Sequence, residues 1–271
     1  MNKLNIVILF ALTGLWVFSP CHQDHGKERG NAQEADPIWN LVWSDEFNSD
    51  TINTNYWTIQ DSYWKKNPKC LYKPAQVTIK NGNLIISAIA IADIYHTGQI
   101  KSDHKVEIGY GKLELRIKMP EGAGLKTAFW MLGVNKDTVG WPRCGEIDIV
   151  EQRGFEPNIT HHNIHWYNEN ESKFTHNGYQ LKSENELTEE WHVYSLIRDE
   201  KKISYFMDGK LFNEYIIVEE MAEFKNLYYF IIQLDIGNEN NWPGPVNEHM
   251  DWPKNLYIDY VRYYRCNSLC H

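Results

Sequence analysis

The sequence predicts an all-β protein built as a sandwich of two antiparallel sheets. Short segments in which apolar and polar residues alternate recur from residue 39 onward, and turn dipeptides such as Asn81-Gly82 and Asp208-Gly209 separate several of them. Helical periodicity is confined to residues 183–190, so the strand–helix alternation of a parallel sheet is missing. With 271 residues, of which 42% are apolar, the chain can bury one sizeable core.

The expected strands follow one another with short turns between them. Residues 78–88 are predicted to form a hairpin around Asn81-Gly82, and residues 112–119 alternate strictly between apolar and charged side chains. Further strands are expected at residues 191–197, 203–207, 211–216, 227–234 and 256–263.

The N-terminal region is typical of an exported protein. Residues 1–20 join Lys3 to an apolar run that is too short for a comfortable membrane span, as in a signal peptide. Cys21 follows directly, which leaves two forms of export open: a bacterial lipoprotein anchored in an outer membrane through Cys21, or simple secretion. Residues 21–36 are expected to be a flexible linker, residues 37–266 one β-sandwich domain, and residues 267–271 a C-terminal tail. We therefore expect a secreted, cell-surface or periplasmic protein.

Charge and cysteine content exclude some partners. The formal net charge of −9 argues against nucleic acid and against an anionic membrane surface. Export permits disulfide bonds, and Cys70, Cys144, Cys266 and Cys270 allow three pairings. Both Cys266–Cys270 and Cys70–Cys144 stay open, and no Cys/His spacing matches a zinc site.

The most informative segment is Gly145–Glu151, which carries three carboxylates among β-branched apolar residues. Successive side chains of a strand point to opposite faces, so Glu146 and Asp148 share one face and Ile147 lies on the other. Glu151 has the wrong parity, because it follows Glu146 by five positions. One β-bulge within residues 149–151 would return it to the acidic face.

A row of this kind can cleave glycosidic bonds. With the bulge absorbed, the Cα atoms of Glu146 and Glu151 are roughly 13 Å apart, and the two side chains can close this to roughly 5–6 Å. That separation is typical of a retaining glycosidase, in which one carboxylate attacks the anomeric carbon and the other transfers the proton. Crowded negative charge also raises at least one pKa, as a general acid at neutral pH requires. The alternative is a solvated strand face that happens to be acidic.

The flanking residues resemble glycoside hydrolase family 16. Residues 140–151, GWPRCGEIDIVE, are similar to the family's active-site strand in the E-x-D-x-x-E form of laminarinases, agarases and carrageenases. Other segments that resemble the family in order and spacing are residues 41–48, 109–118, 128–133, 241–244 and 259–262. The similarity therefore spans about residues 39–264.

This resemblance implies a β-jelly roll with a substrate cleft on the concave face, and roles for the acid row. Glu146 would be the nucleophile, Glu151 the acid/base, and Asp148 a neighbour that orients and tunes Glu146. No cofactor is expected for catalysis, and the protein is expected to be a monomer that acts on a polysaccharide.

Aromatic and histidine residues near the row are the candidates for substrate contacts. Trp141, Trp130 and His165 correspond to residues near the site in the family, and aromatic rings suit the apolar faces of sugars. Core packing is the alternative for Trp130, and a satisfied sheet histidine is the alternative for His165. Trp242 and His176 are weaker matches because the spacing of their loops departs from the family pattern.

A structural calcium is also implied. Glu46, Gly82 and Asp259 match positions that hold calcium on the convex side in many relatives, and carboxylate and carbonyl oxygens are suitable ligands. Turn capping by the two acids explains the same residues equally well.

Three substrate-contacting stretches depart from laminarinases. Lys126-Thr127 stands where they carry Trp-Pro, Gln99 stands where they carry Arg, and Lys69 lies in the segment on the donor side. A β-1,3- or β-1,3-1,4-glucan is the first expected substrate. The alternative is a galactan, sulfated or not, or a galactose-containing host glycan, with Lys126, Lys69 and Gln99 shaping the donor side. A transglycosylase and a non-catalytic glycan-binding module are the other classes of function.

Overall fold

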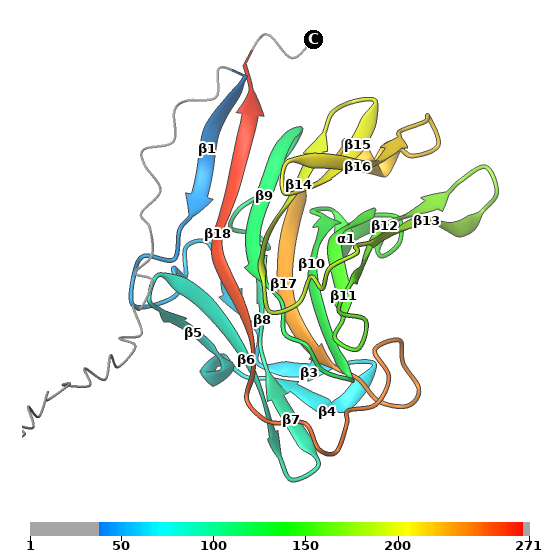
Figure 1. Ribbon diagram of the computed structural model, residues 1–271. Coiled ribbons are helices and arrows are strands. Elements are labelled where there is room, and N and C mark those ends of the chain that lie inside the picture. The colour runs from blue at the N-terminus through cyan, green and yellow to red at the C-terminus, as the bar shows by residue number, and fades with distance from the viewer. Residues whose placement is uncertain (1–37, 268–271) are drawn as a thin grey trace, which may run out of the picture. The chain divides into compact units, whose positions relative to one another are not determined.

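The computed structural model describes residues 38–267, and most of them belong to two packed β-sheets (Figure 1). The signal peptide and Cys21 expected from the sequence, the linker and residues 268–271 of the tail lie outside the described residues. Within residues 38–267, no helix is both long and apolar enough to cross a membrane.

The larger sheet has eleven strands in the order β16-β15-β14-β9-β18-β6-β7-β4-β3, with β1 paired to β18 and β5 paired to β6. Its strands are antiparallel except for the parallel pair β4 and β7. Their bounds are β1 Trp39–Asp45, β3 Ser62–Trp64, β4 Asn67–Tyr72, β5 Val77–Lys80, β6 Asn83–Ile91, β7 Ile94–Thr97, β9 Gly111–Lys118, β14 Trp191–Arg198, β15 Lys202–Met207, β16 Lys210–Ile216 and β18 Lys254–Cys266.

The smaller sheet has seven antiparallel strands in the order β13-β12-β11-β10-β17-β8-β2. Their bounds are β2 Thr58–Ile59, β8 Gln99–Lys101, β10 Leu125–Gly133, β11 Glu146–Arg153, β12 Ile159–Asn168, β13 Lys173–Lys182 and β17 Tyr228–Ile236. Within residues 38–267, three short helices lie in connections: η1 Pro74–Gln76, α1 Lys136–Val139 and η2 Ala222–Lys225. The expected all-β sandwich of two antiparallel sheets is confirmed.

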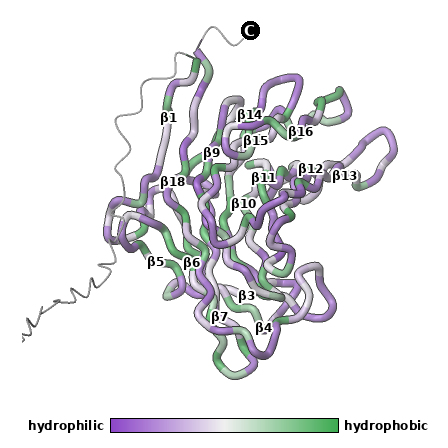
Figure 2. Tube along the Cα trace, viewed as in Figure 1, coloured by the Kyte–Doolittle hydropathy of each residue, from purple (hydrophilic) through white to green (hydrophobic). Residues whose placement is uncertain are grey.

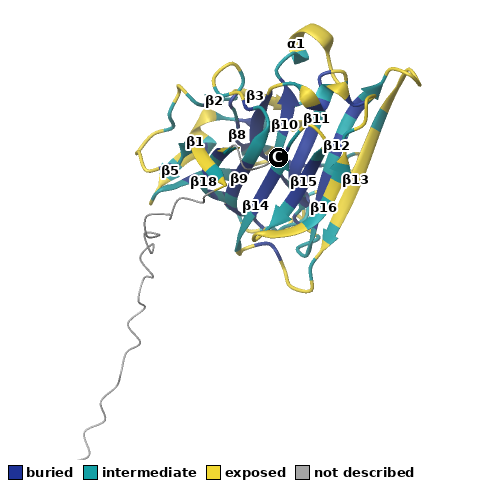
Figure 3. Cartoon of the chain, turned by 90° about the horizontal axis from the view of Figure 1, so that it is seen from above, coloured by how far each residue is buried: buried dark blue, intermediate teal, exposed yellow. Residues whose placement is uncertain are grey.

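Strand alternation decides which side chains fill the space between the sheets. On β9, Leu113, Leu115 and Ile117 are fully buried, as their period of two predicts. In the smaller sheet β10 and β11 lie among buried neighbours, whereas β13 is an exposed edge strand (Figure 3) and is mostly hydrophilic (Figure 2). The sheet that carries the acid row is thus supported from behind by the core and bounded at one side by a polar hairpin.

The helix predicted for residues 183–190 is wrong. The segment consists of bends and irregular backbone, and Thr188 makes a bridge to Met119 beside β9. Leu187 and Thr188 are both buried. Burial of this segment against the larger sheet overrides its short helical pattern.

The structure decides one of the two disulfide pairings that the sequence left open. Cys70 and Cys144 are separate, buried, free thiols, so the alternative that joined them is wrong. Cys70 Sγ instead accepts a hydrogen bond from the Ile236 amide at 3.3 Å. Cys266 is disulfide-bonded, and Cys270 lies outside the described residues.

Candidate active site

The acid row lies on β11, and a bulge sets its geometry. Glu146 stands opposite His165 and Asp148 opposite Asn163 on β12, and the register then shifts before Glu151. On the other side β10 pairs with Asp148 and Val150 but skips Ile149. Ile149 and Val150 are consecutive and both buried, which is the effect of one extra residue in the strand. The predicted bulge is confirmed.

A buried histidine holds the bulge from the core side. His162 Nδ1 lies 2.6 Å from the carbonyl oxygen of Ile149, and its Nε2 lies 2.9 Å from Thr160 Oγ1. Because the carbonyl can only accept, Nδ1 carries the proton and Nε2 accepts from the hydroxyl. Burial lowers the pKa of His162 to about 4, so the ring is neutral near pH 7. The extra residue of the bulge therefore has a satisfied carbonyl, without which burial would be costly.

Neighbouring strands supply partners for each acid. His165 Nε2 lies 3.0 Å from Asp148 Oδ2 and 3.8 Å from Glu146 Oε1. The Asn163 amide donates to Glu151 Oε2 at 3.0 Å. The acids on β11 thus meet a parallel row of polar side chains on β12.

Lys126 on β10 is the cation of the site. Its ammonium donates to Glu151 Oε1 at 2.8 Å and lies 3.6 Å from Asp235 Oδ2 on β17. Only 12% of the Lys126 side chain is exposed. The sequence assigned this lysine to an open sugar-binding position, but its ammonium is buried between two protein carboxylates.

These surroundings push the pKa values of the acids apart. Burial, with the negative charge of Asp148, raises the pKa of Glu146 to about 8. Burial and the charge of Glu151 raise the pKa of Asp148. Burial favours a raised pKa for Glu151 as well. The positive charge and the hydrogen bond of Lys126 have the larger effect, so the pKa of Glu151 is lowered. In the substrate-free site Glu151 is therefore ionised at neutral pH, whereas Glu146 holds a proton.

Trp141 and His165 lie together beside the start of the row. The Trp141 ring is 51% exposed, and its centroid lies 6.4 Å from the His165 ring and 5.1 Å from Phe174. Phe174 and His176 on β13 stack on each other with centroids 5.7 Å apart. The hairpin of β12 and β13 thus extends an exposed aromatic surface away from Glu146.

Trp130 and Trp242 occupy different parts of the site. Trp130 pairs with Asp148 across β10 and β11, and its Nε1 donates to Gln233 Oε1 at 3.3 Å. Trp242 is 40% exposed and packs edge-on against His161, which stands opposite Glu151. The two tryptophans therefore lie on opposite sides of β11.

Gln99 and Lys69, which were both expected on the donor side, lie in different surroundings. Gln99 on β8 contacts Gln233 through its side-chain amide, within the site's hydrogen-bond network. Lys69 instead pairs with Asp93 at 2.6 Å, and both side chains are mostly exposed.

Sequence reasoning missed Asn163, Asp235 and His162. Asn163 could have been found, because it alternates with His165 and His161 on the same strand face. Asp235 gave no local signal, since only the register of β10 with β17 places it opposite Lys126.

Both acids of the expected calcium site have arginine partners. Arg262 donates from Nε and from one terminal nitrogen to the two oxygens of Glu46, both at 2.8 Å. Arg116 donates to Asp259 Oδ2 at 2.8 Å. Arginine already serves as a counter-charge for both carboxylates and would compete with calcium for them.

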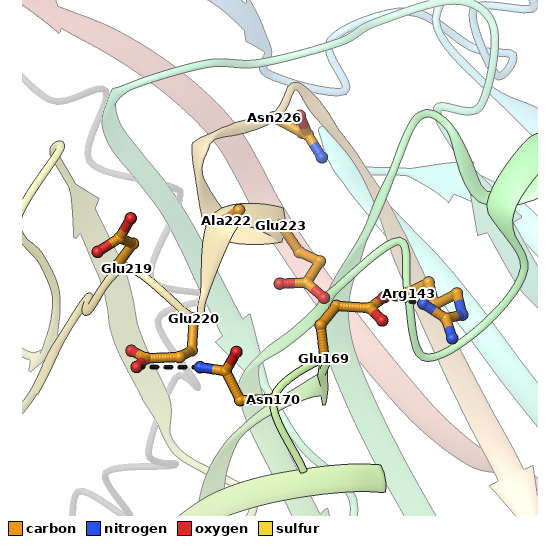
Figure 4. Close-up of a pocket in the computed structure, with 8 residues that line it drawn as sticks. All are labelled: Arg143, Glu169, Asn170, Glu219, Glu220, Ala222, Glu223 and Asn226. Atoms are coloured by element: carbon orange, nitrogen blue, oxygen red, sulfur yellow. Dashed lines mark hydrogen bonds and ion pairs between the residues drawn. The ribbon is translucent and has the colours of Figure 1, made fainter. Parts of the chain in front are cut away.

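A cavity of about 640 Å³ lies apart from the acid row (Figure 4). It is lined by acidic residues of η2 and nearby loops together with Arg143, and no member of the acid row contributes to it. The Arg143 guanidinium stacks on the Tyr167 ring at 3.7 Å, which ties the loop before β11 to β12.

A β-sandwich with paired glutamates on one strand face, flanked by exposed tryptophans, defines a carbohydrate-active protein. The model for the GH16 domain of β-porphyranases A–D matches residues 39–266, and the chain belongs to glycoside hydrolase family 16. Hydrolases of this family need no catalytic cofactor.

Individual relatives cover different activities. A β-glucanase of Rhodothermus marinus is 30% identical over 84% of this chain and 86% of its own length. A keratan-sulfate endo-1,4-β-galactosidase of Sphingobacterium multivorum is 31% identical over 84% of this chain and 55% of its own. The laminarinase structure from Flavobacterium sp. UMI-01 has a TM-score of 0.76, with 30% identity over 83% of this chain and all of that one. Several curated relatives are much longer, and the chain spans 34%, 38% and 55% of three of them.

Proposed function

We propose that this chain is an endo-acting, retaining β-glycosidase. The carrying observation is that Glu146 and Glu151 lie on one face of β11, brought there by the bulge at Ile149. Two carboxylates on one face can divide the work of nucleophile and acid/base. Both glutamates are engaged by a network of neighbouring side chains, which a merely solvated acidic face does not require.

In the first step Glu146 attacks the anomeric carbon and Glu151 protonates the leaving oxygen. The product is a glycosyl-enzyme ester on Glu146 and a released sugar chain. In the second step Glu151, now a carboxylate, takes a proton from water, and the water oxygen replaces Glu146 at the anomeric carbon. His165 and Asp148 stand beside the nucleophile, where their contacts fix its orientation.

The proton distribution of the free enzyme is the reverse of what the first step needs. Glu146 holds a proton in the substrate-free site and Glu151 does not. One proton must therefore leave Glu146, and Glu151 must gain one, before the glycosidic bond breaks. Asp148 lies between them on the same face and is itself raised in pKa, which makes it a suitable relay.

For the substrate we propose a β-linked galactose-containing polysaccharide, with β-1,3-glucan as the second candidate. The match to a porphyranase family model and the similarity to a keratan-sulfate galactosidase support the first. The β-glucanase and laminarinase relatives support the second.

The deciding experiment is a screen of the purified protein on porphyran, agarose, carrageenan, keratan sulfate, mucin glycans, laminarin and mixed-linkage glucan. Product masses would identify an endo-hydrolase by short oligosaccharides, and a transglycosylase by products longer than the starting oligosaccharide. Binding without any change in chain length would identify a glycan-binding module and refute the proposal.

We further propose that the protein is exported and acts as a monomer. The N-terminal apolar run and Cys21 support export, as a lipoprotein or in free form. Intact-mass analysis of the native protein should show loss of residues 1–20, with a diacylglycerol adduct on Cys21 if it is lipidated. A native protein that retains Met1 would contradict export, and light scattering would test the monomer.

A further inference from the structure

Lys126 has two carboxylates within reach and is bound mainly to one of them. Its ammonium lies 2.8 Å from Glu151 Oε1 and 3.6 Å from Asp235 Oδ2, so a small movement would reverse the two distances. Asp235 is fully buried, and 14% of the Glu151 side chain is exposed. A single buried cation is thus placed between the residue assigned as acid/base and a second acid of no assigned role.

Two hydrogen-bond donors hold the Asp235 carboxylate in a position from which it can bind the Lys126 ammonium. The Tyr72 hydroxyl donates to its Oδ1 at 2.5 Å, and the Gln233 amide donates to its Oδ2 at 2.6 Å. Among the ion pairs of residues 38–267, Lys126 is the cation that reaches Asp235. A carboxylate with fixed hydrogen-bond donors and a nearby ammonium can hold that ammonium without rearranging itself.

The reaction requires Glu151 to change its charge twice. It must be a neutral acid when the leaving oxygen is protonated and a carboxylate when water is activated. An ammonium fixed on Glu151 would favour the carboxylate throughout and would oppose the first step. Lys126 therefore has to weaken its bond to Glu151 for that step.

We propose that Lys126 is a positioning residue that exchanges partners during the reaction. It binds Glu151 while that residue is a carboxylate, and it moves to Asp235 when Glu151 becomes protonated. This inference rests on the proposed glycosidase function. The exchange keeps the buried ammonium paired with a carboxylate in both states.

The other groups that face Glu151 do not provide this exchange. Asp148 on β11 is an acid, and His161 and His165 on β12 are the remaining titratable neighbours. Neither histidine is ion-paired with Glu151 itself: His161 Nε2 lies 3.6 Å from Glu156 Oε2, and His165 Nε2 lies 3.0 Å from Asp148 Oδ2.

The first test needs no substrate. In the full chain labelled with ¹³C at the glutamate carboxyls, the Glu151 resonance is assigned by its loss in Glu151→Gln and then titrated. The wild-type Glu151 should titrate below its ordinary pKa. In Lys126→Met its pKa should rise by about 1–3 pH units, the effect expected from one close opposite charge. An unchanged pKa in Lys126→Met would overturn the proposal.

Controls separate this effect from a loss of structure. Lys126→Arg keeps the charge and should restore the low pKa of Glu151. Lys69→Met removes an equal charge from the exposed pair with Asp93 and should leave Glu151 unchanged. If Lys126→Met does not fold, the double variant Lys126→Met/Asp235→Asn removes the cation and one of its anions together, and it should show the same raised pKa.

The second test separates acid catalysis from binding. Asp235→Asn leaves Lys126 with Glu151 as its remaining ion-pair partner, so protonation of the leaving oxygen should suffer. We expect kcat/KM on the active polysaccharide to fall at least about 10-fold, within the range of general acid catalysis. On a 2,4-dinitrophenyl β-glycoside of its released disaccharide, which needs no acid, it should fall less than about twofold.

Equal losses on both substrates would indicate a structural role for Asp235 and would overturn the exchange. If the wild type cleaves neither substrate, the glycosidase function fails. A raised Glu151 pKa in Lys126→Met would then still show that Lys126 lowers the pKa of this carboxylate. The proposed exchange of partners during turnover would be refuted together with the reaction.

Discussion

The contact between His162 and the bulge predicts a specific pH dependence of stability. Burial lowers the pKa of His162 from 6.5 to about 4. A unit of pKa corresponds to about 1.4 kcal/mol. The shift of His162 therefore makes the free energy of unfolding about 3 kcal/mol larger at neutral pH than at acid pH. Because the unfolded chain binds a proton near pH 6.5 and the folded one does not, this contribution is present above pH 6.5 and is lost as pH falls toward 4.

The change to test is His162→Asn, because its amide can still donate near the position of Nδ1 but does not titrate. Urea unfolding at about pH 7.5 and about pH 4.5 gives the free energy of unfolding for both proteins. The wild type should lose about 2.5 kcal/mol more than the variant between these pH values. Comparing the two proteins cancels the other titrating groups, including Glu146 with its pKa of about 8.

His162→Phe serves as the second variant. It keeps a ring against Tyr205 and Phe212 but leaves the Ile149 carbonyl without its donor. At neutral pH it should be less stable by about 1–3 kcal/mol, and it too should lack the extra acid sensitivity. If the wild type and both variants lose the same free energy of unfolding on acidification, the pKa of His162 is not lowered in the folded protein.

Three further predictions concern the site and the arginine-paired acids. Glu146→Gln should abolish turnover and leave the circular dichroism spectrum unchanged, and measurable turnover would remove Glu146 as nucleophile. Phe174→Ala should raise KM about fivefold with little change in kcat, because a stacked ring contributes about 1 kcal/mol; an unchanged KM would place the substrate elsewhere. Glu46→Gln should cost about 1 kcal/mol by breaking the pair with Arg262, whereas calcium or a chelator should leave the wild-type melting temperature unchanged. A clear rise in that temperature with calcium would show that the ion binds despite the arginine pairs.

The sequence predicted those features that depend on alternation along one strand. The shared face of Glu146 and Asp148, and the need for a bulge before Glu151, follow from a period of two and from the buried Ile147. The same alternation predicted the inward face of β9. These features are local, so neighbouring residues decide them.

Features set by strand register could not be predicted in the same way. The pairing of Lys126 with Asp235 depends on how β10 aligns with β17, and these strands are far apart in the sequence. Arg262 pairs with Glu46 across an even longer separation, so the residues near Glu46 do not predict this contact. His162 lies in the polar run His161-His162-Asn163, and composition alone does not indicate that its ring points into the core.

The most direct test of the central claim is azide rescue of Glu151→Ala. If Glu146 forms a glycosyl-enzyme and Glu151 assists both steps, this variant should lose activity on the natural polysaccharide. With the dinitrophenyl glycoside and added azide it should regain turnover and release a glycosyl azide of retained β configuration. An α-configured azide, or near-normal activity on the polysaccharide without azide, would contradict the account.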